Sequence, residues 1–320
     1  DAIIQKFNKE KYNIIVFASN NSLNYFKHKK EAIQLIKIPS PKYLTNKKGE
    51  IDFIKTMTWG ILKNSISIIK SAYIIRNVIK GLDSPIKYAF FDSNYSVFAI
   101  KKLLNKKVYI VSNTPHVLKN LHQIKINYLT SAFIEILDHI HTKLLADHIL
   151  SITLTPNKNS IAPPNRFPFC KIRNKNNSTQ NVLIMLSGLK TKQNKLDSEY
   201  FEKKLKNDYA TKVISGNKEI TYDNSKELLW ADLIISNGGF SSISDSFNLN
   251  TPIIVYPIKN HLEQYINANT IEEYGLGIKL SDKKEIQKKV EIIFKQYNFY
   301  TSNIKNLHKK WNDNENSDYL

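Results

Sequence analysis

The sequence predicts an α/β protein made of two doubly wound, Rossmann-like domains that face each other across a cleft. Two observations favour this class. Short apolar runs alternate with helical patterns, and the alternation stops once near the middle of the chain and then starts again. The 320 residues are enough for two hydrophobic cores. We expect a first domain over 1–165 and a second domain over 166–297, with 298–320 packing back on the first.

Five nearly continuous apolar runs predict the strands of the first domain, because parallel strands that are buried on both faces are apolar throughout. These runs cover 12–19, 33–40, 86–93, 107–113 and 148–155. Helical periodicity predicts a long helix over about 51–80 and another over about 122–146. The numbering starts with a helical pattern, whereas sheet domains of this type start with a strand. We therefore expect an opening strand and its loop to be missing.

The stretch 155–180 is rich in Pro, Asn, Lys and Ser and has little periodicity, so it predicts the passage between the domains. The strands predicted after it cover 181–187, 210–216, 232–237, 251–257 and 276–281. Gly275 is predicted to end a helix at its C-cap. Asp282 and Glu285 have the spacing of a capping box at the start of the next helix.

The composition excludes several classes of protein. The chain is 42% hydrophobic and 23% charged, which is typical of a globular protein and not of a disordered one. It has no apolar run of the ~18–20 residues that span a bilayer, no secretory signal pattern and no His/Cys cluster with metal-site spacing. The single cysteine, Cys170, suits a reducing cytosol. We expect a cytoplasmic protein without a metal or a cofactor.

The formal charge of +19 is distributed unevenly along the chain. Residues 1–165 hold 24 Lys and Arg against 10 Asp and Glu, whereas residues 166–320 hold 23 against 18. This asymmetry predicts an anionic acceptor or a membrane surface as the partner of the first domain. A general bias toward Lys, Asn and Ile is the alternative. Nucleic acid is less favoured as a partner, because Arg is scarce and Lys dominates.

Two adjacent glycines occur in SNGGFSSISDSF, residues 236–247, although the chain has only 9 glycines. The pair follows a predicted strand and precedes a helical pattern, so it lies at the sheet edge where α/β proteins bind ligands. The helix amides and serine hydroxyls could hold a phosphate there, and Asp245 could reach a sugar hydroxyl. The residues proposed for this turn are Asn237, Gly238, Gly239, Phe240, Ser241 and Ser242. A plain turn is the alternative.

Glu263 and Gln264 begin the helix that follows the next predicted strand, so they should lie on the same sheet edge as the glycine pair. Their side chains could accept hydrogen bonds from the hydroxyls of a hexose and donate to them. A polar helix start capped by Asn260 is the alternative.

These two elements together resemble the C-terminal donor domain of GT-B nucleotide-sugar glycosyltransferases, and most of all the MurG-like family 28 group. The resemblance covers about residues 181–295. It rests on Ala231-Asp232, Gly238-Gly239, Ser241-Ser242, Asp245, Pro252, Pro257, Glu263-Gln264, Asn267-Ala268, Gly275 and Gly277. It implies that the 238–242 loop holds the donor diphosphate and that Glu263 and Gln264 bind the transferred sugar. Asp245, where the family usually has Glu, would meet the ribose.

The resemblance has further implications for the site. Ser187 and Gly188 would face the phosphates, and Tyr222 would lie near the nucleobase. The second domain would bind the donor and the first the acceptor. In the first domain, FFDSNY and VSNTPHVL end adjacent predicted strands, so Asp92 and His116 are the candidate catalytic residues. A turn residue and a partly buried polar residue are the respective alternatives.

The implied reaction transfers a hexose, with N-acetylhexosamine among the candidates, from a nucleoside-diphosphate sugar to an acceptor hydroxyl. A UDP-sugar donor, inversion and independence of metal are expected. The basic, apolar stretch 51–80 suits a lipid-linked or cell-envelope acceptor and a peripheral position at the inner membrane face; an ordinary core helix is the alternative. A DNA-modifying glucosyltransferase and a non-catalytic nucleotide-sugar-binding protein remain as alternative functions.

Overall fold

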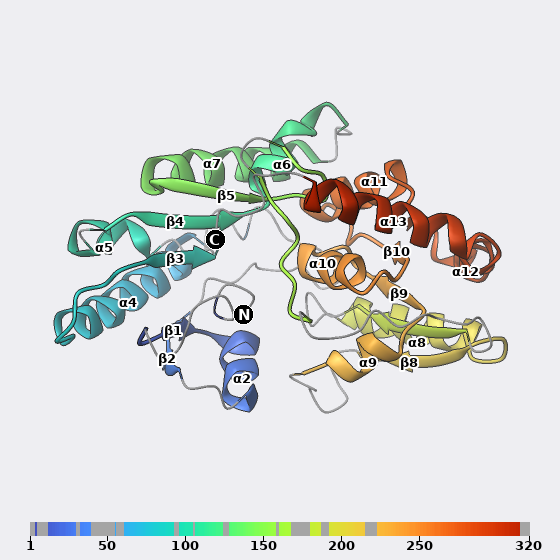
Figure 1. Ribbon diagram of the computed structural model, residues 1–320, viewed down its shortest axis with the longest axis horizontal. Helices are drawn as coiled ribbons and strands as arrows, with labels where there is room; N and C mark the ends of the chain where they lie inside the picture. Colours follow the sequence, from blue (N-terminus) through green and yellow to red (C-terminus); the bar gives the residue numbers. More distant parts are fainter. Residues whose placement is uncertain are drawn as a thin grey trace.

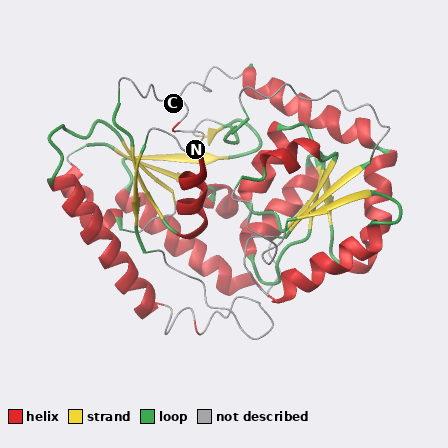
Figure 2. Ribbon diagram, turned by 90° about the horizontal axis from the view of Figure 1, so that it is seen from below, coloured by secondary structure: helices red, strands yellow, loops and turns green. Residues whose placement is uncertain are grey.

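The computed structural model describes residues 4, 12–29, 33–39, 55, 61–92, 96–104, 106–123, 128–157, 160–167, 180–186, 192–214 and 223–313. Two α/β units lie side by side in it, one built from β1 to β6 and the other from β7 to β11 (Figure 1). Every strand pair in both units is parallel. Helices flank the strands of both units (Figure 2). The predicted fold class is confirmed.

The first unit holds its described strands in two sheets. β1 (Ile15–Ala18) pairs with β2 (Gln34–Lys37), and a second sheet has the order β3-β4-β5-β6. The strands of the second sheet are β3 (Ala89–Asp92), β4 (Val108–Ser112), β5 (His148–Ile152) and β6 (Ser160–Ile161). The helices are α2 (Asn20–Lys29), α4 (Ile61–Lys80), α5 (Val97–Leu104), α6 (Thr114–Lys119) and α7 (Leu129–Leu145), with a 3₁₀ turn η2 (Leu121–Gln123).

The second unit has one five-stranded sheet in the order β11-β10-β9-β7-β8. Its strands are β7 (Asn181–Met185), β8 (Ala210–Val213), β9 (Leu233–Ser236), β10 (Ile253–Val255) and β11 (Gly277–Lys279). Its helices are α8 (Lys192–Leu205), α9 (Ser225–Trp230), α10 (Phe240–Asn248), α11 (Leu262–Glu273), α12 (Ile286–Lys295) and α13 (Tyr297–Asn312), with a 3₁₀ turn η4 (Lys283–Glu285).

The apolar runs of β7, β9 and β10 form the core of the second unit, and every residue of these strands is buried. Alternate side chains point to opposite faces of the sheet. Leu183 and Ile234 therefore join one hydrophobic cluster, and Ile184 and Ile235 join another. Each fully buried side chain of this size contributes about 1.5–3 kcal/mol. The sheet is thus fixed from both sides, which leaves its strand ends to carry the polar turns.

The last helix, α13, connects the second unit to the first. It runs from α12 towards the middle of the molecule (Figure 1), where Trp311 Nε1 donates a hydrogen bond of 2.9 Å to the Leu154 carbonyl. Leu154 lies just after β5 and is buried with Trp311 in the same cluster. α13 therefore contacts the segment that follows β5.

Helix boundaries differ from the expectation at two places. Where a helix was predicted over 122–146, the described residues form the 3₁₀ turn η2 and the helix α7. At Asp282 the side chain accepts a 2.9 Å hydrogen bond from the Lys284 amide and caps η4, so α12 starts only at Ile286 with Glu285 as its N-cap residue. Asp282 thus caps the short 3₁₀ turn η4, whereas the sequence pattern predicted that it would cap the following helix. Gly275 follows the last turn of α11 with a φ of +61°, and its role in ending that helix is confirmed.

None of the helices that the structure describes is both long enough and apolar enough to cross a lipid bilayer.

Candidate active site

The turn between β9 and α10 contains two glycines that serve different purposes. Gly238 has a φ of +82°, and a β carbon on it would lie 2.4 Å from Val255 Cγ1. Gly239 has an ordinary extended conformation, with φ −63° and ψ 142°, and is the N-cap residue of α10. No described atom lies within 4 Å of a β carbon built on Gly239. Gly238 is therefore required by the fold, whereas Gly239 leaves open space directly before the helix.

The first turn of α10 borders this space. Ser241 is exposed, and Gly239, Phe240 and Ser242 are half-buried, whereas Ile243 and Phe247 on the opposite face are buried. A helix N-terminus presents backbone N–H groups and a positive partial charge, so this position suits an anion.

Glu263, in the first turn of α11, lies at the start of α10. Burial raises the pKa of Glu263. The side chains of Asn113 and Asn267 and the Phe240 amide lie near enough to its carboxylate to act in the opposite direction. Asn267 Nδ2 also donates to the Gly238 carbonyl at 2.9 Å. The sequence prediction that the glycine turn and the start of α11 share one sheet edge is confirmed.

Gln264 is turned towards its own unit. Its side chain is buried, and Oε1 accepts a 2.9 Å hydrogen bond from the Ile258 amide. This bond fixes the loop between β10 and α11. The predicted contact of Gln264 with a sugar would therefore use the amide nitrogen of the Gln264 side chain.

The first unit faces this edge with the residues that end β3 and β4. Asn113 Nδ2 lies 3.4 Å from Glu263 Oε1 and 3.3 Å from Asn267 Oδ1. The charge of Asp92 raises the pKa of Glu263, so these two carboxylates are close enough to repel each other. Asp92, a predicted catalytic residue, thus lies in the first unit near this edge of the second sheet. Asn113 belongs to the same arrangement but was not singled out by the sequence.

Two asparagine side chains, one directly after β4 and one directly after β9, have an unpaired oxygen atom among the described residues. Asn113 Oδ1 and Asn237 Oδ1 are buried and accept no hydrogen bond from the described residues. Asn237 Nδ2 donates to the Tyr256 carbonyl at 3.0 Å, which holds its side chain in place. Buried polar atoms are normally paired, so two unpaired acceptors beside the glycine turn suit a ligand that carries hydroxyl donors.

His116, the second predicted catalytic residue, lies in the interface between the units. Its Nε2 is 3.2 Å from Thr270 Oγ1 on α11. Burial lowers the pKa of His116 to about 4, helped by the charge of Lys119, so the imidazole is neutral at pH 7. The same interface contains Tyr128 and Tyr265, whose ring centroids are 4.6 Å apart, and a cluster formed by Val117, Ala132, Leu262 and Ile266. In this arrangement His116 helps to join the two units.

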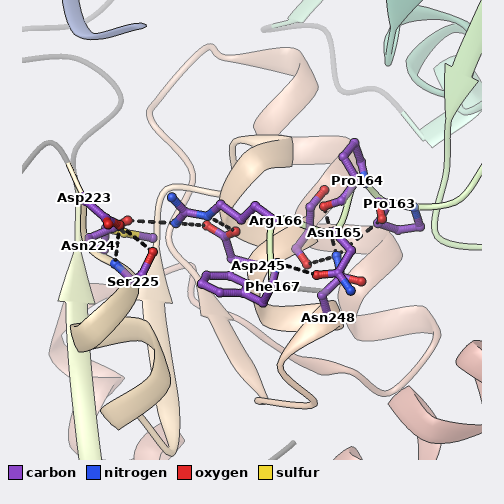
Figure 3. A network of polar contacts seen from close by, with 12 residues as sticks. Pro163, Pro164, Asn165, Arg166, Phe167, Asp223, Asn224, Ser225, Asp245 and Asn248 are labelled. Carbon is purple, nitrogen blue, oxygen red and sulfur yellow. Dashed lines mark hydrogen bonds and ion pairs between the residues drawn. The ribbon is translucent and has the colours of Figure 1, made fainter. Parts of the chain in front are cut away.

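Asp245, on α10, is paired with Arg166 (Figure 3). Arg166 Nε and Nη2 donate to the two carboxylate oxygens, both at 2.8 Å, and Nη2 also donates to Asn224 Oδ1 at 2.7 Å. Burial raises the pKa of Asp245, and the guanidinium acts in the opposite direction. Both carboxylate oxygens of Asp245 accept hydrogen bonds from Arg166. The predicted contact of Asp245 with a ribose would therefore require one of these hydrogen bonds to be replaced.

Arg166 was missed by the sequence analysis. It lies in the segment between the units, where Asn248 Nδ2 also donates to the carbonyls of Pro163 and Pro164 (Figure 3). The available signal was composition, because Arg166 is one of only three arginines in a chain that otherwise uses lysine. Ser187, Gly188 and Tyr222 lie outside the described residues.

Within the part of the chain that the structure describes, no group of three or more His, Cys, Asp or Glu side chains is arranged to hold a metal ion.

The second unit is similar to a family of known proteins. Residues 169–316 match the model of the glycosyltransferase family 28 C-terminal domain. An uncharacterized glycosyltransferase of Methanopyrus kandleri is 32% identical over 69 residues, which are 21% of this chain and 20% of that protein. The NDP-glycosyltransferase YjiC of Bacillus subtilis is 32% identical over 83 residues, 25% of this chain and 20% of that protein. The matched segments thus span about a fifth of the length of these curated relatives.

Solved structures resemble both units together. Phytolacca americana UGT2 complexed with UDP-2fluoro-glucose and pterostilbene has a TM-score of 0.62 at 12% identity, over 98% of this chain and 90% of that one. The glycotransferase of kitacinnamycin has a TM-score of 0.57 at 12% identity, over 92% and 87% of the two chains. The two units therefore have the GT-B arrangement that the sequence resemblance implied.

Proposed function

We propose that this chain is a GT-B glycosyltransferase that moves a hexose from a nucleoside-diphosphate sugar to an acceptor hydroxyl. The family match of the second unit and the GT-B fold of the whole support the reaction class. A UDP-sugar is the proposed donor, supported by the UDP-2fluoro-glucose bound to the Phytolacca americana structure. Transfer of an N-acetylhexosamine, as in the MurG-like group, is the finer form of this proposal.

The observation that carries the proposal is the open start of α10. The position of a Gly239 β carbon is free of described atoms, and the next amide, that of Phe240, lies near the Glu263 carboxylate and lowers its pKa. A diphosphate bound at this amide would replace the carboxylate. Glu263 would then be available to accept a hydrogen bond from a hydroxyl of the hexose, and Asn113 Oδ1 and Asn237 Oδ1 could accept others.

The proposed reaction is a direct displacement at the anomeric carbon with inversion. The acceptor oxygen attacks while the nucleoside diphosphate leaves with the bonding electron pair. The amides of α10 and the hydroxyls of Ser241 and Ser242 stabilise the negative charge that develops on the leaving group. In this scheme the helix performs the charge stabilisation without a metal ion.

Gly239→Val is expected to weaken UDP binding about tenfold or more, because the added side chain fills the space before α10. The free energy of unfolding should stay within about 0.5 kcal/mol of wild type, since the backbone at Gly239 is extended and no described atom lies within 4 Å of its β-carbon position. Isothermal titration with UDP, UDP-glucose and UDP-N-acetylglucosamine measures the affinity, and urea unfolding measures the stability. Wild-type protein that binds none of these nucleotides, or Gly239→Val that binds them as well as wild type, would contradict the proposed donor site.

We also propose a lipid-linked or cell-envelope acceptor reached at an anionic membrane face. The exposed side of α4 combines Ile66, Ile69 and Tyr73, which are 49%, 68% and 65% exposed, with cations and no acidic residue. The exposed cations of this helix are Lys63, Lys70, Arg76 and Lys80. α7 adds a stripe at helical spacing, made of Leu129, Phe133, Ile136, Leu137, Ile140 and Leu144. Apolar side chains among lysines are typical of helices that lie on anionic membranes.

Ile69→Ser combined with Tyr73→Ser is expected to reduce binding to phosphatidylglycerol vesicles about tenfold, because two exposed apolar side chains no longer enter the lipid. Co-sedimentation measures the binding. Leu196→Ser is the matched control, since Leu196 is 48% exposed on α8 in the second unit. Equal binding to phosphatidylcholine vesicles, or salt-sensitive binding to duplex DNA without vesicle binding, would contradict the membrane proposal.

A further inference from the structure

Arg166 lies where the strand order of the second sheet reverses. β8 follows β7 on one side, whereas β9, β10 and β11 extend the sheet on the other, so the reversal falls between β7 and β9. α/β sheets bind ligands beyond the carboxyl ends of the strands at such a point. The guanidinium donates to Asp245, on the helix after β9, and to Asn224, at the start of α9. Asn224 Nδ2 in turn lies 3.1 Å from Met185 Sδ, at the end of β7. Arg166 therefore bridges the two sides of the reversal.

The segment between the units follows one face of α10 towards the start of that helix. Asn248 holds it through two proline carbonyls, and Asp245 holds it through Arg166, three residues nearer the helix start (Figure 3). Ser241 precedes Asp245 by four residues, so it lies on the same face about one turn, or roughly 5.4 Å, closer to the start. The carboxylate that holds the guanidinium is thus about one helical turn from the proposed diphosphate position.

Arg166 has donors that its described partners leave unused. Its Nε and Nη2 supply the three hydrogen bonds to Asp245 and Asn224, and Nη1, which carries two N–H groups, has no hydrogen-bond partner among the described residues. The side chain remains partly exposed. On the same face of α10, Ser244 is buried, and its hydroxyl is also unpaired within the described part of the chain. Buried polar groups are normally paired, so these groups suit a ligand that brings acceptor oxygens.

We propose that Arg166 binds the phosphate that is attached to the nucleoside of the donor, so that the segment between the units forms part of the nucleotide site. The inference rests on the proposed function, which places the diphosphate at the start of α10. A guanidinium presents its N–H groups in a planar fork that matches the oxygens of a phosphate. Asp245 is then a positioning residue, which holds the guanidinium from the other side. This role differs from the ribose contact that the sequence resemblance implied for Asp245.

The test titrates the full chain with uridine, UMP and UDP, which differ only in the number of phosphates. Arg166→Lys keeps the positive charge beside Asp245 but loses the planar fork. We expect it to lower the affinity for UMP and for UDP about tenfold, and to leave the affinity for uridine unchanged because uridine has no phosphate. Calorimetry measures the nucleotides, and ligand-observed NMR measures the nucleoside. Lys295→Arg, in the exposed pair of Lys295 with Glu291 on α12, is the matched control and should bind all three ligands as wild type does.

Asp245→Asn tests the same contact from the other side. The amide keeps the shape of the side chain but removes the negative charge that competes with the phosphate for the guanidinium. We expect the affinity for UMP to increase about threefold or more, with the affinity for uridine unchanged. A carboxylate that instead accepted hydrogen bonds from the ribose would give the opposite result, an equal loss of affinity for uridine and UMP.

A loss of UMP affinity in Arg166→Lys with intact uridine binding supports the phosphate contact. Wild-type affinity for UMP in Arg166→Lys, or equal losses for uridine and UMP in either variant, overturns it. If Gly239→Val loses UDP binding in the same experiments, the proposed donor site still stands. A wild-type chain that binds none of the three ligands overturns both proposals. If Arg166→Lys does not fold by urea unfolding, or wild type binds uridine too weakly to titrate, Asp245→Asn decides: increased UMP affinity supports the contact, and its absence overturns it.

Discussion

Arg166→Met is expected to lower the free energy of unfolding by about 3–5 kcal/mol at pH 7, because it leaves the Asp245 carboxylate buried without its partner. The wild-type pair is close, with both guanidinium–carboxylate contacts at 2.8 Å and side chains that are 19% and 10% exposed. Arg166 also satisfies Asn224 Oδ1, which would lose its donor. Urea unfolding followed by circular dichroism measures the change.

Whether the unpaired charge of Asp245 causes the loss of stability in Arg166→Met can be tested by substituting Asp245 and by changing the pH. Without Arg166, burial should hold the Asp245 pKa above its unfolded value of about 3.9. The cost of Arg166→Met is then fully present above the folded pKa and disappears as the pH falls below about 4. Arg166→Met combined with Asp245→Asn should recover at least half of the loss at pH 7. A cost that is the same at pH 7 and pH 4, or a double variant no better than the single one, would show that lost packing and not the unpaired charge is responsible.

Gly238→Ala is expected to destabilise the protein by about 2–5 kcal/mol. The left-handed conformation costs about 1–2 kcal/mol for a residue with a β carbon, and forcing extra atoms into a packed core costs about 1–3 kcal/mol more. Both conditions apply here, because φ is +82° and the new β carbon would lie 2.4 Å from the buried Val255 side chain. The turn would have to move, and the Asn267 contact to the Gly238 carbonyl would be strained.

Gly239→Ala is the matched control for this prediction, since the neighbouring glycine has a negative φ and open space at its β carbon. Its stability should equal that of wild type within about 0.5 kcal/mol. Thermal and urea unfolding of the two variants compare them directly. Similar losses in both variants would mean that the whole turn needs glycine for conformational freedom, and would contradict separate roles for the two glycines.

The strands of the second unit were predictable because their burial on both faces leaves a continuous apolar signal. LIIS in β9 and IIV in β10 are fully buried and flanked by polar turns, so periodicity and composition agree. The helix starts were less predictable. Asp282 is followed by the 3₁₀ turn η4 and not directly by α12. The same capping sequence can precede a 3₁₀ turn or an α-helix, so the pattern does not tell the two apart.

The sequence by itself determined the α/β class and the sheet edge that Gly238, Gly239 and Glu263 share, because the turns that follow neighbouring parallel strands lie at one edge whatever the remaining packing is. Only the tertiary structure decided which side chains meet across the units. Asn113 and Arg166 reach their partners over separations of 150 and 79 residues. No local pattern records such a contact, because the free energy that fixes it comes from the packing of α6 and α7 against α11 and of the linker against α10.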